Sequence, residues 1–179
     1  GRALSSKRVR SSVHFRSVPL SRTDCASCTS SPSSTSSASS SATVWAALSA
    51  GSHVVATTDD PEEVESILRL SPEAVAAGRS VVVGAAMSPG LTCLLARHAA
   101  SLLDVVDEIH VTRDGAAGPA CARQRLRALR GAAQEWRDGT WVRRAGFSGR
   151  ELSWFPDPIG ARDCYRADLA EPLVLVDAF

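Results

Sequence analysis

The stretch that most constrains the fold is residues 79–91, with the sequence RSVVVGAAMSPGL. Residues 80–83 are short, β-branched and continuously apolar, which is typical of a strand covered on both faces. Gly84 ends that strand where the backbone needs unusual dihedral angles or a close approach. Ser88 favours the N-cap of a helix and Pro89 its first position. The pattern predicts a strand, a tight turn and a helix start. In open α/β sheets, ligands bind in the crevice at the carboxyl ends of the strands. An ordinary strand-to-helix connection is the alternative interpretation.

The first 41 residues differ in composition from the rest of the chain. Sixteen of them are Ser, and five Arg and one Lys against one Asp give them a charge of +5, which leaves −4 for the remainder. Such a segment has too few large apolar residues to offset its conformational entropy, so we expect residues 1–41 to be disordered. Its composition superficially resembles a transit peptide, and sequence foreign to the fold is an equally good interpretation. A nucleic-acid-binding tail is disfavoured because no aromatic residues are interleaved with the Arg residues.

Cysteine usage and hydropathy exclude several classes of protein. Five Cys residues at scattered positions argue against a disulfide framework and favour a reducing, cytoplasmic compartment. Cys25 and Cys28 form a CxxC, but no second pair follows it, and we expect no metal site. No apolar run approaches the roughly 20 residues of a membrane helix, so no membrane partner is expected. The chain begins at Gly1 and ends in an apolar run, so we expect it to be a fragment.

Residues 42–103 alternate between predicted helices and strands. These are a helix at 44–48, a strand at 53–58, a helix that opens at Asp60 and Pro61 and restarts at 71–73, the strand at 80–83, and a helix after Ser88. The alternation predicts parallel strands joined by crossovers, which is half of a doubly wound fold. The last helix has one apolar face, formed by Leu91, Leu94, Leu95, Leu102 and Leu103. His98 falls on the same face and is interpreted as a core or edge histidine.

The second half of the chain has the pattern of an antiparallel sheet. Strands are predicted at 108–113, 151–155, 163–166 and 173–176. The Asp138-Gly139 turn predicts a hairpin in which Trp136 lies opposite Trp141. A helix is predicted at 120–130, and one of its faces carries a basic stripe formed by Arg123, Arg127 and Arg130. The stripe is either a solvated face or an anchor for an acidic substrate or a cofactor phosphate.

The sequence lacks the usual phosphate-binding motifs. No Walker-type loop occurs, and no G-x-G-x-x-G follows a strand. A dinucleotide site needs that glycine turn to admit the pyrophosphate. We therefore expect the first strand and glycine turn of a dinucleotide-binding fold to be missing from this chain.

Two runs carry a family resemblance. AGSHVVATTDD at 50–60 and GAAMSPGLT at 84–92 resemble the saccharopine dehydrogenase family, whose members often show AGxxYVDxxDD and, about 25 residues later, GxxPGxxN. Gly84, Pro89 and Gly90 match that pattern. The resemblance therefore rests on the same turn that organises the predicted fold.

The resemblance spans residues 43–179, and within it the chain departs from the family's sequence pattern at two places. The family's Tyr-Val-Asp becomes part of HVVA at 53–56, and Cys93 stands near the usual Asn. GPACARQ at 118–124 and WFPDPIGARDCY at 154–165 resemble bacterial members of the same broad group. These motifs indicate the family more strongly than they indicate a substrate.

We expect three regions. Residues 1–41 are the disordered segment that composition predicts, and the resemblance does not cover them. Residues 42–90 are the C-terminal part of a Rossmann-like domain, with a partial doubly wound parallel sheet. Residues 91–179 are an incomplete α+β domain with a mostly antiparallel sheet, which binds substrate or forms a homodimer.

The resemblance also implies a site around the central turn. NAD or NADP would contact Asp59, Gly84, Ala85 and Met87, and a small-molecule substrate would contact Ser88, Pro89 and Gly90. The implied protein is an NAD(P)-dependent oxidoreductase acting on an amino-acid-derived substrate, inactive as this fragment because the glycine turn is absent. The alternative is a non-catalytic truncated relative that serves only packing or protein association. No catalytic residue is identified.

Overall fold

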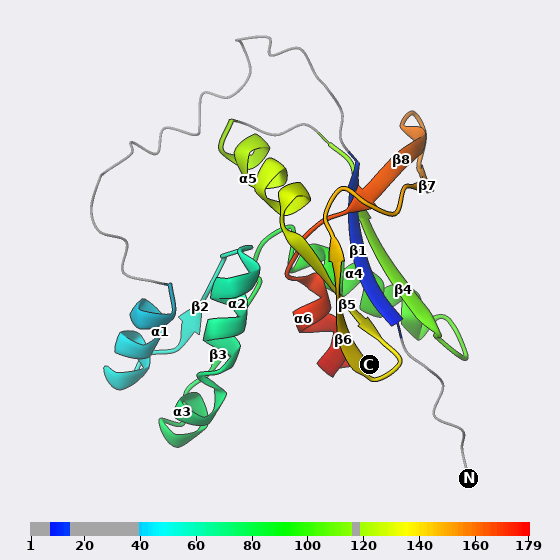
Figure 1. Ribbon diagram of the computed structural model, residues 1–179. Coiled ribbons are helices and arrows are strands. Elements are labelled where there is room, and N and C mark those ends of the chain that lie inside the picture. The colour runs from blue at the N-terminus through cyan, green and yellow to red at the C-terminus, as the bar shows by residue number, and fades with distance from the viewer. Residues whose placement is uncertain (1–7, 15–39, 116–118) are drawn as a thin grey trace.

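A computed structural model of the chain describes residues 8–14, 40–115 and 119–179 (Figure 1). The helices are α1 (Ser40–Ser49), α2 (Pro61–Leu68), α3 (Ser71–Ala76), α4 (Leu91–Ser101), α5 (Pro119–Arg130), α6 (Glu171–Leu175) and the 3-10 turn η1 (Val176–Ala178). The strands are β1 (Arg8–His14), β2 (Val54–Val55), β3 (Val81–Val82), β4 (Glu108–Arg113), β5 (Ala132–Arg137), β6 (Thr140–Ala145), β7 (Glu151–Phe155) and β8 (Gly160–Arg166). The predicted mixed α/β class is confirmed, and none of the described helices is long and apolar enough to cross a membrane.

Strands β2 and β3 form a small parallel sheet joined through α2 and α3. Helix α2 begins as predicted, because the Asp60 side chain accepts hydrogen bonds from the backbone amides of Glu62 and Glu63 and Pro61 follows the cap. One face of the pair is covered by an apolar cluster from α1, α2 and α3 that contains Val44, Leu48, Ile67 and Ala74. On the other face Val55 is 65% exposed and Val82 is 51% exposed. The sheet therefore has one covered face and one open face.

The larger sheet is built around β1. Its order is β6-β5-β1-β8-β7, and β4 pairs with β1 in parallel while β5 and β8 pair with it antiparallel. The expectation of disorder is therefore wrong for residues 8–14, and Ser40 and Ser41 belong to α1. Composition misleads here because backbone pairing does not need apolar side chains where neighbouring strands present unpaired groups. The rest of that expectation, for residues 1–7 and 15–39, lies outside the described residues.

The predicted hairpin is confirmed. Strands β5 and β6 pair so that Trp136 lies opposite Trp141, and Asp138 and Gly139 both have positive φ as the turn requires. The two indole centroids are 5.1 Å apart with the rings at 71°, an edge-to-face arrangement. Strands β4 and β7 also match their predicted bounds.

The predicted strand at 173–176 is wrong, because this segment is helical in α6 and η1. Pro172 in the first turn supplies no amide to a strand ladder but fits a helix start. Leu175 is 1% exposed and packs in a cluster with Cys93 and Val111. Tertiary packing thus selects a helix for a sequence that is apolar and β-branched.

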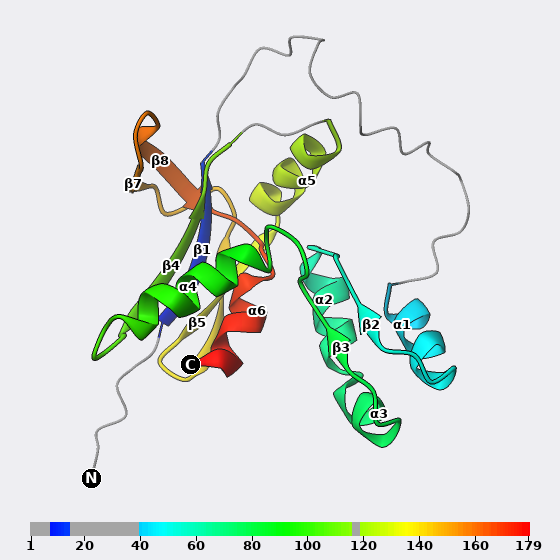
Figure 2. The same cartoon turned by 180° about the vertical axis from the view of Figure 1, so that it is seen from behind.

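Helix α4 lies across the back of the larger sheet (Figure 2). It packs through Cys93 and Ala96 rather than through its leucines. The five predicted core leucines are exposed, at 51% for Leu91, 69% for Leu94, 58% for Leu95, 73% for Leu102 and 61% for Leu103. His98 is also exposed, so of the two interpretations, a core or an edge histidine, the core one is wrong. The sheet accepts the face with small side chains, which lets the helix backbone approach closely.

Candidate functional site

A cleft of about 900 Å³ lies between the small sheet, α5 and the segment before α6. It is lined by residues 57–61 and 63 after β2, 86–88 after β3, 113–115 after β4, 123–125, 127 and 128 of α5, and 168, 169 and 171. Segments that follow both parallel strands therefore converge on the cleft, at the end of a parallel sheet where ligands commonly bind.

The walls of the cleft carry both signs of charge. The acidic side chains are Asp59, Asp60, Glu63, Asp114, Asp168 and Glu171, and the basic ones are Arg113, Arg123, Arg125 and Arg127. Two of the three arginines in the predicted stripe thus face the cleft, whereas Arg130 does not line it. A mixed lining of this kind suits a ligand with both a positive and a negative group better than a purely anionic ligand.

The residues predicted for the site fall into two groups. Asp59, Met87 and Ser88 line the cleft. The Gln124 side chain of α5 donates a hydrogen bond to Asp59, which ties the segment after β2 to that helix. The remaining residues, Gly84, Ala85, Pro89 and Gly90, are not among the lining residues and instead form the loop behind Ser88.

Gly84 and Gly90 allow this loop to fold tightly. Gly84 has φ +71°, and a Cβ there would lie 3.0 Å from the Pro89 ring, which confirms the predicted unusual dihedral and close approach. Gly90 has φ +140°, and a Cβ there would lie 2.2 Å from the carbonyl oxygens of Gly84 and Ala86. Only glycine fits both positions without displacing backbone.

The predicted helix start at Ser88 and Pro89 is wrong, since α4 begins at Leu91 with Gly90 at its N-cap. The Leu91 amide donates to the Ala86 carbonyl and the Thr92 amide to the Met87 carbonyl, both at 3.0 Å. Loop carbonyls therefore replace the side-chain cap, and the Ser88 hydroxyl is released for another partner.

That partner is Glu171, a site residue that the sequence does not reveal. Ser88 Oγ donates to Glu171 Oε1, and Thr92 Oγ1 donates to the same atom at 3.2 Å. Glu171 is fully buried, and its second oxygen, Oε2, has no hydrogen-bond partner within the described ranges. A Glu in the first turn of a helix is an ordinary sequence feature, so no local signal distinguishes this one.

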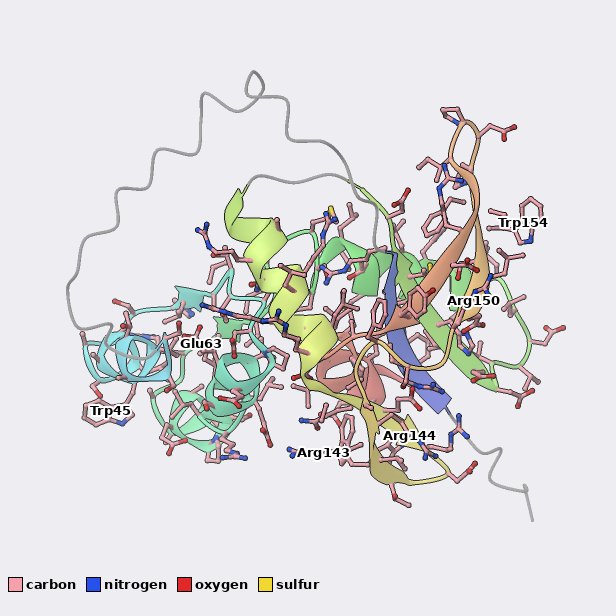
Figure 3. The ribbon with its side chains drawn as sticks, turned by 45° about the horizontal axis from the view of Figure 1, so that its top comes forward. Trp45, Glu63, Arg143, Arg144, Arg150 and Trp154 are labelled. Atoms are coloured by element: carbon pink, nitrogen blue, oxygen red, sulfur yellow. The ribbon has the colours of Figure 1, made fainter. Side chains whose placement is uncertain are left out.

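Two carboxyl groups of the cleft differ in their affinity for protons. Burial raises the pKa of Asp168, the neighbouring Asp60 raises it further, and Arg143 opposes the shift. Hydrogen bonds from Ser40 at 2.6 Å and Thr58 at 2.7 Å lower the pKa of Glu63, whose position Figure 3 shows. Asp168 is therefore the better candidate for holding or accepting a proton in the cleft.

Replacing Asp168 by Asn is expected to raise the melting temperature at neutral pH. A folded-state pKa above the unfolded value means that stability is lost as pH rises through the folded pKa. The gain from Asn should therefore disappear below about pH 3, where the carboxyl is protonated in both states. Thermal unfolding across this pH range measures it, with Asp104→Asn as a control at an exposed carboxylate. An Asn variant whose melting temperature at pH 7 is no higher than that of the unsubstituted protein would contradict the assignment.

Helices α2 and α4 follow the two parallel strands, where a Rossmann-like fold would bind the pyrophosphate of NAD(P). The first amides of α2 are capped by Asp60, and Glu62 and Glu63 add negative charge in the same turn. The first amides of α4 already donate to loop carbonyls. A pyrophosphate needs free amides and a positive helix end, so neither of these two helix starts provides a pyrophosphate site.

Comparisons with protein-family models, curated proteins and solved structures find no match to this chain. Among the described residues, no group of three or more His, Cys, Asp or Glu side chains is placed to hold a metal ion.

Proposed function

We propose that the chain is part of an NAD(P)-dependent oxidoreductase resembling the saccharopine dehydrogenase family, and that the cleft binds its amino-acid-derived substrate. The observation that carries the proposal is the convergence of acidic and basic side chains at the carboxyl ends of β2 and β3. In this proposal the parallel pair is the later part of a Rossmann-like sheet. The free, buried thiols of Cys93 and Cys164 support a reducing, cytoplasmic location.

The protein's own residues have three roles in this proposal. The arginines of α5 attract a substrate carboxylate, and Asp168 holds or accepts a proton next to the substrate. The hydrogen bond between Gln124 and Asp59 fixes the two walls relative to each other. When bound, the nicotinamide cofactor would supply the hydride chemistry.

The 179-residue chain is expected to bind NADH and NADPH only weakly. Each charge-assisted hydrogen bond to a pyrophosphate contributes about 1.5–3 kcal/mol, and every 1.4 kcal/mol or so changes the affinity about tenfold. Losing two or three such bonds weakens a micromolar site to millimolar or beyond. Fluorescence or calorimetric titration measures this, and saturable binding in the low micromolar range would contradict it.

The oxidoreductase proposal itself is tested on a longer chain. A longer protein that contains this chain is expected, on this proposal, to carry a strand followed by G-x-G-x-x-G. The extended protein should then reduce NAD or NADP when supplied with amino acids. An extended chain that contains the glycine turn, binds the cofactor and shows no amino-acid-dependent turnover would contradict the proposal.

One observation favours the alternative function of protein association. The open face of the small sheet and the outer face of α4 expose large apolar side chains, such as Val55, Leu94 and Leu102. Contiguous apolar patches mark interaction surfaces on soluble proteins. This alternative predicts that the chain forms a homodimer or a larger assembly. Analytical ultracentrifugation of the chain measures the mass of that assembly.

A further inference from the structure

Three carboxylate oxygens in the cleft are buried without a hydrogen-bond partner in the described part of the chain. They are Asp114 Oδ1, Asp168 Oδ1 and Glu171 Oε2, and all three residues line the cleft. Buried polar atoms in folded proteins are nearly always paired, so each exception needs an explanation. A ligand that donates a hydrogen bond to a carboxylate is one such explanation.

Glu171 is the most enclosed of these residues. It is fully buried, whereas Asp114 and Asp168 are only partly so. Its Oε1 already accepts from two hydroxyl groups, those of Ser88 and Thr92, and neither carries positive charge. A buried carboxylate without a positive partner is costly. Oε2 is therefore the atom of Glu171 that a positively charged donor in the cleft would bind.

We propose that Glu171 binds the protonated amine of the cleft's ligand, and that Arg123 and Arg127 of α5 bind its carboxylate. This inference rests on the proposed function, because it specifies how the same cleft orients an amino-acid-type substrate. The ammonium group donates one hydrogen bond to Oε2, and the hydroxyl oxygens of Ser88 and Thr92 accept the others. The three residues come from three segments: the loop after β3, helix α4 and the start of α6.

The negative end of the ligand is fixed by the geometry of α5. Arg123 and Arg127 are four residues apart, so they lie on the same face of the helix, and both line the cleft. Arg130 is on the same helix but does not line the cleft. A planar guanidinium pairs with a carboxylate through two parallel hydrogen bonds. Charge at both ends thus selects an amino acid over a simple amine or a simple acid.

Binding of three related probes to the full chain tests this orientation without any cofactor. The probes are 6-aminohexanoate, which carries both charges, hexylamine, which carries only the amine, and hexanoate, which carries only the carboxylate. Calorimetry gives the affinities, and NMR reports whether the Ser88 and Thr92 signals move. We expect 6-aminohexanoate to bind most tightly and both amines to shift the Ser88 and Thr92 signals. Amines that leave those signals unmoved would overturn the inference, whatever the behaviour of any variant.

Two charge-removing variants separate the two ends of the ligand. Glu171→Gln keeps an oxygen for the Ser88 and Thr92 hydroxyls but removes the charge, and should weaken 6-aminohexanoate and hexylamine by about tenfold or more while leaving hexanoate unchanged. Arg127→Gln should weaken 6-aminohexanoate and hexanoate but not hexylamine. The matched controls are Glu73→Gln and Arg130→Gln, which remove the same charges outside the cleft. Equal effects of Glu171→Gln and Glu73→Gln would overturn the inference.

Three further outcomes separate the alternatives. Displacement of hexylamine by millimolar magnesium chloride, but not by sodium chloride of equal ionic strength, would identify a metal site and overturn the amine assignment. Amine binding that depends on Glu171, together with no amino-acid-dependent turnover in the cofactor-binding extended chain, contradicts the proposed oxidoreductase alone. Turnover that is insensitive to Glu171→Gln contradicts the amine assignment alone.

Discussion

Removal of residues 1–14 is expected to abolish the cooperative unfolding of the chain, whereas removal of residues 1–7 is expected to leave it intact. The longer deletion removes β1, which pairs with β4 along one edge and with β5 and β8 along the other. Its loss exposes backbone donors and acceptors on all three neighbours at once. Strand β1 has eleven paired positions with its three neighbours. Each buried group left unpaired costs about 1–3 kcal/mol, so the loss of most of these pairings is comparable with the typical stability of about 5–15 kcal/mol.

Calorimetry and circular dichroism of the two truncated chains measure this difference. A single substitution provides a milder version, since Ser11→Pro removes a ladder amide from the middle of β1. Ser5→Pro is the matched control, because β1 begins at Arg8. A chain without residues 1–14 that melts within about 2 °C of the full chain would show that the sheet does not depend on β1.

Local signals in the sequence predict a substantial part of this fold. The start of α2 is predictable because Asp60 and Pro61 act within one turn of the helix. The β5–β6 hairpin is predictable because Asp138-Gly139 sets both the turn type and the register that faces Trp136 to Trp141. In each case the residues that decide the structure are neighbours in the sequence.

The features missed by the sequence depend on partners that are distant in the chain. Strand β1 has the composition of a disordered segment and is ordered by strands about 100 residues away. The α4 leucines form a regular stripe, but the sheet packs on the opposite face. Glu171 is paired with Ser88, 83 residues earlier, and only the folded chain brings them together. Such contacts leave no periodic pattern, so periodicity alone does not reveal them.

Replacing Gly90 by Ala is expected to cost more than about 3 kcal/mol of folding stability. The new Cβ would lie 2.2 Å from two backbone carbonyl oxygens, so the clash is not relieved by turning a side chain. The φ of +140° adds strain for any residue that has a Cβ. Relief requires the loop at 84–90 to move, and this displaces Ser88 from Glu171. The substitution should therefore weaken amine binding in the cleft as well as lower stability.

The matched control for this effect is Gly78→Ala. Gly78 also has a positive φ, +60°, but a Cβ there meets nothing within 4 Å, so only the dihedral strain of about 1–2 kcal/mol applies. Urea unfolding of both variants separates the strain from the clash, because the difference between their free energies of unfolding is the cost of the two close contacts. Equal losses in the two variants would mean that the loop adjusts freely. In that case Gly90 would not be what holds Ser88 against Glu171.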